Sequence, residues 1–285
     1  MKLMKNRMLN NGKSTFLAVT FFGVMTLLSC FAAKAQDDAN TPLSTNPLFT
    51  TTGPVVLAKG SLLWNNAVDY YHIHVDNTQG FDANLHSVGY SGGLRWGVGK
   101  NLELSMNLSA NYNTWDTVYL KSNTSLNPTI GARLLLFEGR AALPQTSFYT
   151  KLGITAFQTA YEPQRWDAML QPEIGLLFRN GIGKRFAIDY QLGWAWNNYS
   201  INAYEVSSGV RFGLYGRWLA GERLMLGVGM SNINAPNRFE GNFEACYLIK
   251  PDLQIVGRAG VSGSKGSIGG DTQVNGLLGV CWKIR

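Results

Sequence analysis

Residues 86–112 read HSVGYSGGLRWGVGKNLELSMNLSANY, and this stretch decides the fold. Bulky or aromatic residues occupy alternate positions in both arms: Val88, Tyr90, Leu94, Trp96 and Val98 in the first, and Leu102, Leu104, Met106, Leu108, Ala110 and Tyr112 in the second. Successive side chains of an extended chain point to opposite faces, so a period of two predicts strands. The polar link Gly99-Lys100-Asn101 between the arms is typical of a tight turn. The stretch therefore predicts a β-hairpin.

The length of the two arms favours a membrane barrel. A soluble sandwich or a lipocalin-like barrel also has alternating strands, but soluble strands usually run about five or six residues. Each arm here runs about ten residues or more, which is the span of a tilted strand across a bilayer. The polar face includes Arg95 and Glu103, which suit a water-filled lumen.

The N-terminus predicts export. Basic residues at the start of the chain lead into an apolar run at 16–28, and Ala33-Lys34-Ala35 then offers small residues for cleavage. Residues 1–35 are therefore predicted to be a Sec signal peptide that is cleaved near Ala35. The apolar run is too short to be a comfortable membrane helix, and no later stretch approaches the ~20 apolar residues that one needs. Leu27-Leu28-Ser29-Cys30 also resembles a lipoprotein box, which leaves lipidation at Cys30 open.

Charge and cysteine content exclude several classes of function. Residues 1–35 hold five of the 25 basic residues and none of the acidic ones, so the formal net charge falls from +7 to +2 after cleavage. This balance does not favour a nucleic-acid partner, which needs a clustered basic face. Cys246 and Cys281 are expected inside the barrel, two strands apart. Strand spacing then separates their Cα atoms by about 10 Å, beyond disulfide reach, and the spacing of the two cysteines fits no zinc pattern.

The chain divides into the signal peptide, an extension and a barrel. Residues 36–60 carry several prolines and no sustained period, so we expect a periplasmic extension that either lies in the lumen or hangs free. Residues 61–285 are predicted to form an all-β, transmembrane antiparallel β-barrel. Its twelve expected strands are 61–75, 85–98, 102–112, 126–137, 145–157, 169–179, 185–196, 203–217, 223–231, 239–249, 253–262 and 272–284. An even number returns both ends to one side, with short turns in the periplasm and longer loops outside.

The tryptophans support the same register. Membrane barrels concentrate aromatic residues at their two interfaces. The predicted aromatic girdle consists of Trp64, Trp96, Trp218 and Trp282 at the periplasmic end, and Trp194 and Trp196 at the outer end, with Trp115 and Trp166 also near the outer end. The expected partners of this surface are the lipid bilayer and lipopolysaccharide of a Gram-negative outer membrane.

The opposite face of the strands carries charges of both signs. The predicted lumen-lining residues are Arg95, Glu103, Arg133, Lys151, Glu173, Asp189, Glu205, Arg211, Glu240, Glu244 and Arg258. They can pair across strands and fill the interior, or form a polar constriction that selects solutes, and both can hold together. Inward glycines, among them Gly175 and Gly193, are expected to bend strands or to keep a passage open. Twelve strands lie between filled eight-stranded barrels and open porins, so a narrow channel is physically plausible.

Signals for catalysis are weak. His86 and Ser87 are adjacent in a strand, so their side chains face opposite sides and cannot form a base and nucleophile. His72 and His74 share a face, but no third ligand stands at a fixed spacing, so no metal site is predicted. No phosphate loop, GxSxG or HExxH motif occurs. We expect no catalytic residues, no cofactor and no enzymatic activity.

The junction of the extension and the first strand, VVLAKGSLLWNNAVDYY, resembles the family of outer-membrane proteins named for the MetA pathway of phenol degradation. The hairpin LRWGVGKNLELSMNLS follows as it does in that family. The chain departs from the family at Asn46-Pro47-Leu48-Phe49, where Thr-Asp-Arg-Pro is usual, and at Leu63 and Asn65 in place of Gln and Glu. The resemblance implies a barrel that transports small, hydrophobic or aromatic compounds.

The sequence thus favours a channel or transporter for small solutes. Two alternatives stay open: a structural or interaction barrel without transport, and a lipid-modifying barrel enzyme.

Overall fold

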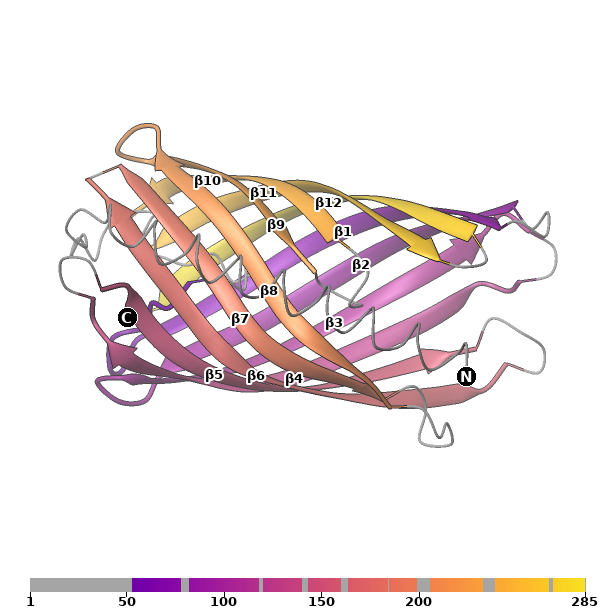
Figure 1. Cartoon of the computed structure of the whole chain (residues 1–285), viewed down its shortest axis with the longest axis horizontal. Coiled ribbons are helices and arrows are strands. Elements are labelled where there is room, and N and C mark those ends of the chain that lie inside the picture. Colours follow the sequence, from indigo (N-terminus) through magenta and orange to yellow (C-terminus); the bar gives the residue numbers. More distant parts are fainter. Residues whose placement is uncertain are drawn as a thin grey trace, which may run out of the picture.

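The chain forms a closed antiparallel barrel of twelve strands (Figure 1). The computed structural model describes residues 53–77, 82–117, 120–139, 143–159, 164–183, 185–198, 206–232, 239–266 and 269–284. The strands are β1 (Leu62–Asn77), β2 (Asp82–Gly97), β3 (Leu102–Trp115), β4 (Asn123–Phe137), β5 (Gln145–Gln158), β6 (Trp166–Ile182), β7 (Phe186–Asn198), β8 (Val206–Leu219), β9 (Leu224–Ser231), β10 (Phe239–Lys250), β11 (Leu253–Gly266) and β12 (Gly269–Ile284). The predicted fold class and each predicted strand are confirmed.

The first and last strands close the ring. β1 pairs with β12 from Leu62↔Ile284 to Asn77↔Gly269, and every other strand pairs with its neighbours in the chain. Closure satisfies the backbone N–H and C=O groups that an open edge would leave unpaired in hydrocarbon. No helix among the described residues is long and apolar enough to cross a membrane.

The strands run further than predicted at one end of the barrel. β2 begins at Asp82 and β12 at Gly269, so the predicted loops 76–84 and 263–271 shrink to 78–81 and 267–268. Alternation fades in these segments, but adjacent antiparallel strands continue to exchange backbone hydrogen bonds, which need no side-chain pattern. We call this end the loop end. The opposite end, where β1 starts, β12 finishes and the turns 98–101 and 251–252 lie, is the turn end.

The outer face is an apolar belt. Val68, Ile130, Val228 and Leu278 are 56%, 59%, 64% and 66% exposed. Monomeric soluble proteins rarely expose contiguous apolar surface on this scale, which indicates contact with lipid. Tryptophans lie on this face near the strand ends: Trp64, Trp96, Trp218 and Trp282 at the turn end, and Trp166, Trp194 and Trp196 towards the loop end. Trp115, the last residue of β3, has the inward register of Glu103.

The apolar core lies inside the barrel at the turn end. It consists of Ala187, Leu219, Met225, Cys246, Val256 and Cys281, contributed by β7 to β12. Cys246 on β10 and Cys281 on β12 are buried thiols on strands that are separated by β11. This cluster fills one side of the lumen where large side chains from neighbouring strands converge.

Two paired glycines hold a tyrosine against the inner wall. Gly175 on β6 pairs with Gly193 on β7, and a Cβ on Gly175 would lie 2.7 Å from the Tyr149 ring. The two missing side chains therefore create the space in which Tyr149 lies. This is a packing role for inward glycines, beyond strand bending.

Replacing Gly175 with alanine is expected to destabilise the folded barrel by about 1–3 kcal/mol. The added Cβ would lie 2.5 Å from the carbonyl oxygen of Leu192, which is backbone and cannot rotate away. Samples are heated to increasing temperatures before electrophoresis. The temperature at which the band of the compact, folded barrel is lost measures this effect. The matched control is Gly257→Ala, where nothing lies within 4 Å of the new Cβ. Equal shifts for both variants would contradict the packing role.

Candidate solute site in the lumen

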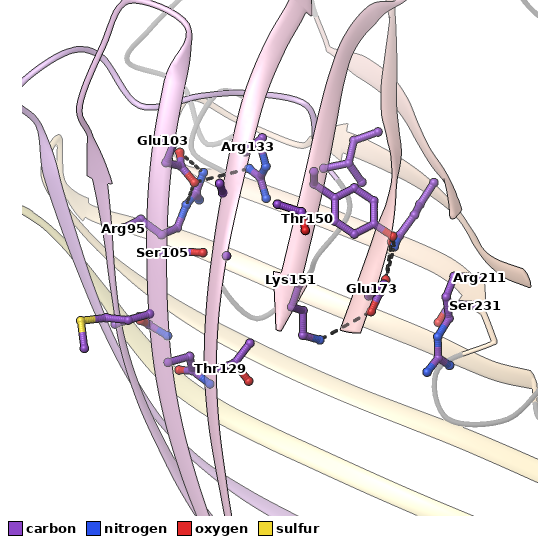
Figure 2. Close-up of a pocket in the computed structure, with 18 of the residues that line it drawn as sticks. Arg95, Glu103, Ser105, Thr129, Arg133, Thr150, Lys151, Glu173, Arg211 and Ser231 are labelled. Carbon is purple, nitrogen blue, oxygen red and sulfur yellow. Dashed lines mark hydrogen bonds and ion pairs between the residues drawn. The ribbon is translucent and has the colours of Figure 1, made fainter. Parts of the chain in front are cut away.

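The structure encloses a cavity of about 450 Å³ in the lumen (Figure 2). Its lining includes eight of the sequence-predicted residues: Arg95, Glu103, Arg133, Lys151, Glu173, Arg211, Glu240 and Arg258. Asp189 and Glu244 also face inward and are buried, but they lie outside this lining. Glu205 lies outside the described residues. Neutral polar groups complete the cavity, among them Asn65, Asn107, Thr129, Gln191 and Tyr215.

The neutral members were not singled out from the sequence. They share the register of the charged residues, so period-two alternation carries the signal that could have identified them. Among the charged lining residues, the cations are Arg95, Arg133, Lys151, Arg211 and Arg258, and the carboxylates are Glu103, Glu173 and Glu240. The lining therefore has a formal excess of two positive charges.

A buried arginine–glutamate cluster lies at the turn-end side of the cavity. Arg95 Nε donates to Glu103 Oε1 at 2.6 Å and Arg95 Nη2 to Glu103 Oε2 at 2.7 Å. Arg133, directly opposite Glu103 in the β3–β4 register, places Nη1 3.8 Å from Glu103 Oε1. The bidentate geometry gives the pair strong, directional hydrogen bonds. One carboxylate thus serves two guanidinium groups, and other acceptors must contribute.

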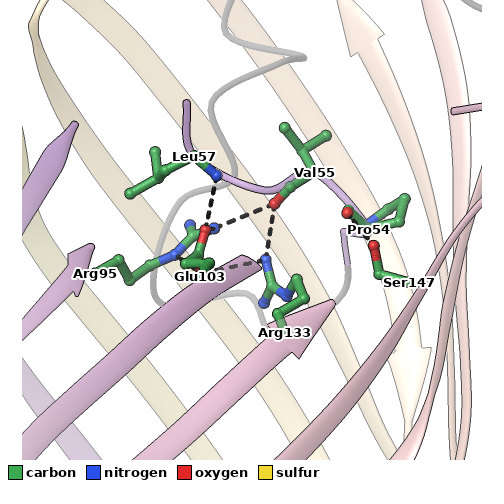
Figure 3. A network of polar contacts seen from close by, with 7 residues as sticks. All are labelled: Pro54, Val55, Leu57, Arg95, Glu103, Arg133 and Ser147. Carbon is green, nitrogen blue, oxygen red and sulfur yellow. Dashed lines mark hydrogen bonds and ion pairs between the residues drawn. The ribbon is translucent and has the colours of Figure 1, made fainter. Parts of the chain in front are cut away.

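Those acceptors come from the chain segment before β1 (Figure 3). We call residues 53–58 the strap. The Val55 carbonyl accepts from Arg95 Nη2 at 3.3 Å and from Arg133 Nη1 at 3.0 Å. The Leu57 amide donates to Glu103 Oε2 at 3.0 Å, and the Ser147 hydroxyl donates to the Pro54 carbonyl. These contacts draw the strap across the inner face of β2 to β5, so the described part of the extension lies in the lumen.

A glycine permits the close approach of the strap. A Cβ on Gly97 would collide with the Ala58 carbonyl oxygen and would lie 2.6 Å from that of Leu57. Gly97 and Gly60 are also joined by a backbone hydrogen bond of 2.7 Å from Gly60 N to Gly97 O. The β2 backbone therefore touches the strap with no side chain between them.

A second polar cluster lines the middle of the cavity. Tyr149 Oη donates to Glu173 Oε1 at 2.6 Å, and Gln191 Nε2 donates to Tyr149 Oη at 2.5 Å. Lys151, opposite Glu173 in the register, holds its Nζ 3.7 Å from Glu173 Oε2, and its side chain is 41% exposed. This ammonium is therefore only loosely paired and remains accessible from the cavity (Figure 2).

The remaining charges form pairs on the far wall. Arg179 Nε and Arg217 Nε lie 2.6 and 2.8 Å from the two carboxylate oxygens of Asp189. Arg258 pairs with Glu240 and also donates from Nε to Asn242 Oδ1 at 3.0 Å. Arg211 Nη1 donates to the Asn232 carbonyl at 3.0 Å and lines the cavity. Buried charges are paired or hydrogen-bonded here, as their desolvation requires.

A recess lies on the outer face of the wall beside this cavity. It measures about 480 Å³ and is lined mainly by outward apolar residues of β1 to β5, including Trp64, Leu108 and Ile154. Met106, Asn107 and Thr129 line both the recess and the lumen cavity. Gly92 and Gly93 also line the recess, and the side chains of Asn65 and Asn107 occupy the space beside Gly93.

Pro128 interrupts the ladder beside the recess. The described β4–β5 register passes from Leu126↔Ala156 to Thr129↔Gly153 with no pair between them. Proline has no N–H to contribute to a ladder. The ladder between β4 and β5 is therefore interrupted beside the recess.

No family model and no curated protein matches the chain, so the family resemblance seen in the sequence stays a prediction. Solved structures share the fold. The chain is similar to the COG4313 outer membrane channel from Pseudomonas putida F1, with 14% identity, a TM-score of 0.57, and coverage of 84% of this chain and 100% of that one. It is also similar to the translocator domain of the autotransporter NalP from Neisseria meningitidis, with 12% identity, a TM-score of 0.51, and coverage of 79% and 88%. At these identities the likeness shows that the chain has the fold of outer-membrane β-barrels.

Proposed function

We propose that the protein is an outer-membrane channel for small solutes. The chain would reach the outer membrane by Sec export, with cleavage of the signal peptide near Ala35, and the turn end of the barrel would lie in the periplasm. The observation that carries this proposal is a polar cavity of about 450 Å³ inside a closed barrel whose outer face is apolar. A structural barrel needs no such space. The similar COG4313 protein is an outer membrane channel, which is consistent with the same role.

The cavity chemistry favours small polar or anionic solutes. Its lining has the excess of two positive charges described above. Fixed charges along a narrow path set ion preference. Lys151 and Arg211 are the cations that we assign to solute contact. Both line the cavity and neither contacts the strap, whereas the remaining cation, Arg258, is paired with Glu240.

The strap is the proposed gate. The strap crosses the inner face of β2 to β5, and the apolar cluster lies on the side of β7 to β12, so we infer that solute passage at the turn end requires the strap to move. Its described side-chain-to-backbone bonds hold it through the atoms of Pro54, Val55 and Leu57. Each such bond contributes about 0.5–1.5 kcal/mol, or about 1.5–3 kcal/mol when one partner is charged. None of these bonds belongs to a ladder between strands, so displacement of the strap breaks no strand pairing.

Gly97→Ala is expected to raise single-channel conductance in planar bilayers, because the new Cβ would force the Ala58 and Leu57 carbonyls away from the wall. Deletion of residues 36–58 is expected to raise conductance further. Gly257→Ala is the control, since its Cβ meets nothing within 4 Å. Unchanged conductance in both altered proteins would show that the strap does not gate. Silence in every folded protein would instead favour the structural barrel.

Arg211→Ala and Lys151→Ala are each expected to lower the anion-to-cation permeability ratio, because each removes a positive charge from the lining. Reversal potentials measured in a salt gradient give this ratio directly. Lys100→Ala, a change in the exposed turn 98–101 outside the cavity lining, serves as the control. A ratio that does not change in the two lining variants would contradict the assignment of these cations to the solute path.

A second candidate is a channel for hydrophobic solutes, which the resemblance to the phenol-degradation family implies. The wall recess beside Pro128 supports it, because this apolar hollow shares Met106, Asn107 and Thr129 of its lining with the lumen cavity. An apolar solute entering from the loop end would then leave sideways through this part of the wall into the bilayer.

Filling the recess separates the two candidates. Ile154→Trp is expected to reduce uptake of a labelled monoaromatic hydrocarbon by intact cells several-fold, while anion conductance stays unchanged, because Ile154 lines the recess and faces outward. Val228→Trp, on the outer face of β9 and outside the recess, is the control. Uptake that is equal in both variants would exclude the sideways route.

A further inference from the structure

The three histidines of the chain come together on one outward patch near the loop end of β1 and β2. His72 lies directly opposite His86 in the β1–β2 register, and their ring centroids are 4.6 Å apart. His74 lies two residues further along β1, on the same face. Only His72 and His74 were grouped from the sequence, because the register that adds His86 depends on the length of the β1–β2 connection.

Hydrogen bonds orient two of these rings. Tyr70 Oη lies 2.9 Å from His86 Nδ1, and Asn84 Oδ1 lies 3.0 Å from His74 Nδ1. Asp116 accepts from the Asn84 backbone amide at 2.7 Å and from its Nδ2 at 2.5 Å. These bonds hold the pKa of Asp116 below its usual range. Because the Asp116 carboxylate can only accept, the Nδ2 group of Asn84 must point towards Asp116 and its Oδ1 towards His74. His74 Nδ1 is therefore the donor in its bond with Asn84.

His72 differs from the other two. Its Nδ1 is buried and has no hydrogen-bond partner among the described residues. A buried nitrogen without a partner is costly, and a bound ligand would remove that cost. In the tautomer of His86 that donates from Nδ1 to Tyr70, Nε2 carries a lone pair. A ring nitrogen that donates to a fixed acceptor while the other nitrogen binds a metal is the usual arrangement at histidine metal sites.

We propose that His72 and His86 chelate one divalent transition-metal ion of the Ni²⁺, Cu²⁺ or Zn²⁺ class on the outside of the barrel. Imidazole suits these ions, which prefer nitrogen ligands to the oxygen sites that hold Mg²⁺ or Ca²⁺. No group of three or more metal-binding side chains is arranged as a complete site among the described residues. The site therefore supplies two protein ligands, and water fills the remaining positions.

The site lies at the loop-end rim of the apolar belt. His72 follows Trp64 by eight residues on β1. At ~3.3 Å per residue and a strand tilt of ~40°, this separation corresponds to a rise of about 20 Å, close to the ~25 Å height of the apolar band of such barrels. A hydrated cation can be accommodated at that level, whereas it could not at the centre of the bilayer.

The test uses the full mature protein in detergent, without a polyhistidine tag. Calorimetric titration with Cu²⁺ and with Ni²⁺ is expected to show one saturable site. His72→Ala and His86→Ala each convert the chelate to a single ligand and should weaken the affinity by at least about tenfold. The Cu²⁺ electron paramagnetic resonance spectrum should change from two coordinating nitrogens to one. His72→Gln and His86→Gln serve where an alanine variant fails to insert.

Two further variants separate ligation from positioning. Tyr70→Phe removes the partner of His86 and should weaken the affinity on the order of tenfold, yet keep the two-nitrogen spectrum. Val88→Ala, an exposed neighbour on the outer face of β2, should leave the affinity and the spectrum unchanged. The proposal would be overturned if the His72 and His86 variants kept the affinity and the spectrum of the unaltered protein. It would also be overturned if the unaltered protein showed no saturable binding.

Discussion

The hydrogen-bonded seam between β1 and β12 is the constraint on which the rest of the structure depends. Hydrocarbon offers no partner to a backbone amide or carbonyl, so a sheet in the membrane must close on itself. Once closed, each strand has one face towards lipid and one towards the lumen, and a shift of one residue would exchange them. The pairing Leu62↔Ile284 to Asn77↔Gly269 therefore determines that Trp64 and Trp282 face lipid while Asn65 and Cys281 face inward.

A ring of twelve strands encloses more volume than inward side chains of ordinary size fill evenly, and the chain fills it in two ways. On the side of β7 to β12, Met225, Cys246 and Val256 pack as an apolar cluster. On the side of β2 to β5, Arg95, Glu103 and Arg133 fill the space with the help of the strap. The charges of this cluster require partners, as do Asp189 and Glu240 on the opposite side, because an unpaired buried charge is strongly destabilising. The cavity above both halves is the part that neither mode of filling reaches.

The sequence predicted the barrel well because a period of two is a local signal that each strand repeats. The inward parity of Arg95, Glu103 and Lys151 follows from that signal alone. The position of the strap could not be predicted in the same way. Its contacts are made by the backbone carbonyls of Pro54 and Val55 and the backbone amide of Leu57, and every residue type has such groups, so the sequence pattern does not reveal them. To predict the wall recess, one would have to place Pro128 of β4 near Gly92 and Gly93 of β2, a strand that does not pair with β4. To predict the pairing of His72 with His86, one would need the exact length of the β1–β2 connection.

The way in which the strap is held has a consequence for how this part of the chain can change over time. The wall binds the strap as an extended peptide, through the amide and carbonyl groups of its backbone. The side chains of the wall that form these hydrogen bonds are Ser147, Arg95, Arg133 and Glu103. The side chains of Val55 and Leu57 take no part in those bonds. These bonds therefore constrain the backbone path and length of residues 53–58, and the buried side chain of Pro54 adds a constraint of its own. The inner wall of β2 to β5 therefore holds residues 53–58 as a groove holds an extended peptide, with the difference that this peptide belongs to the same chain.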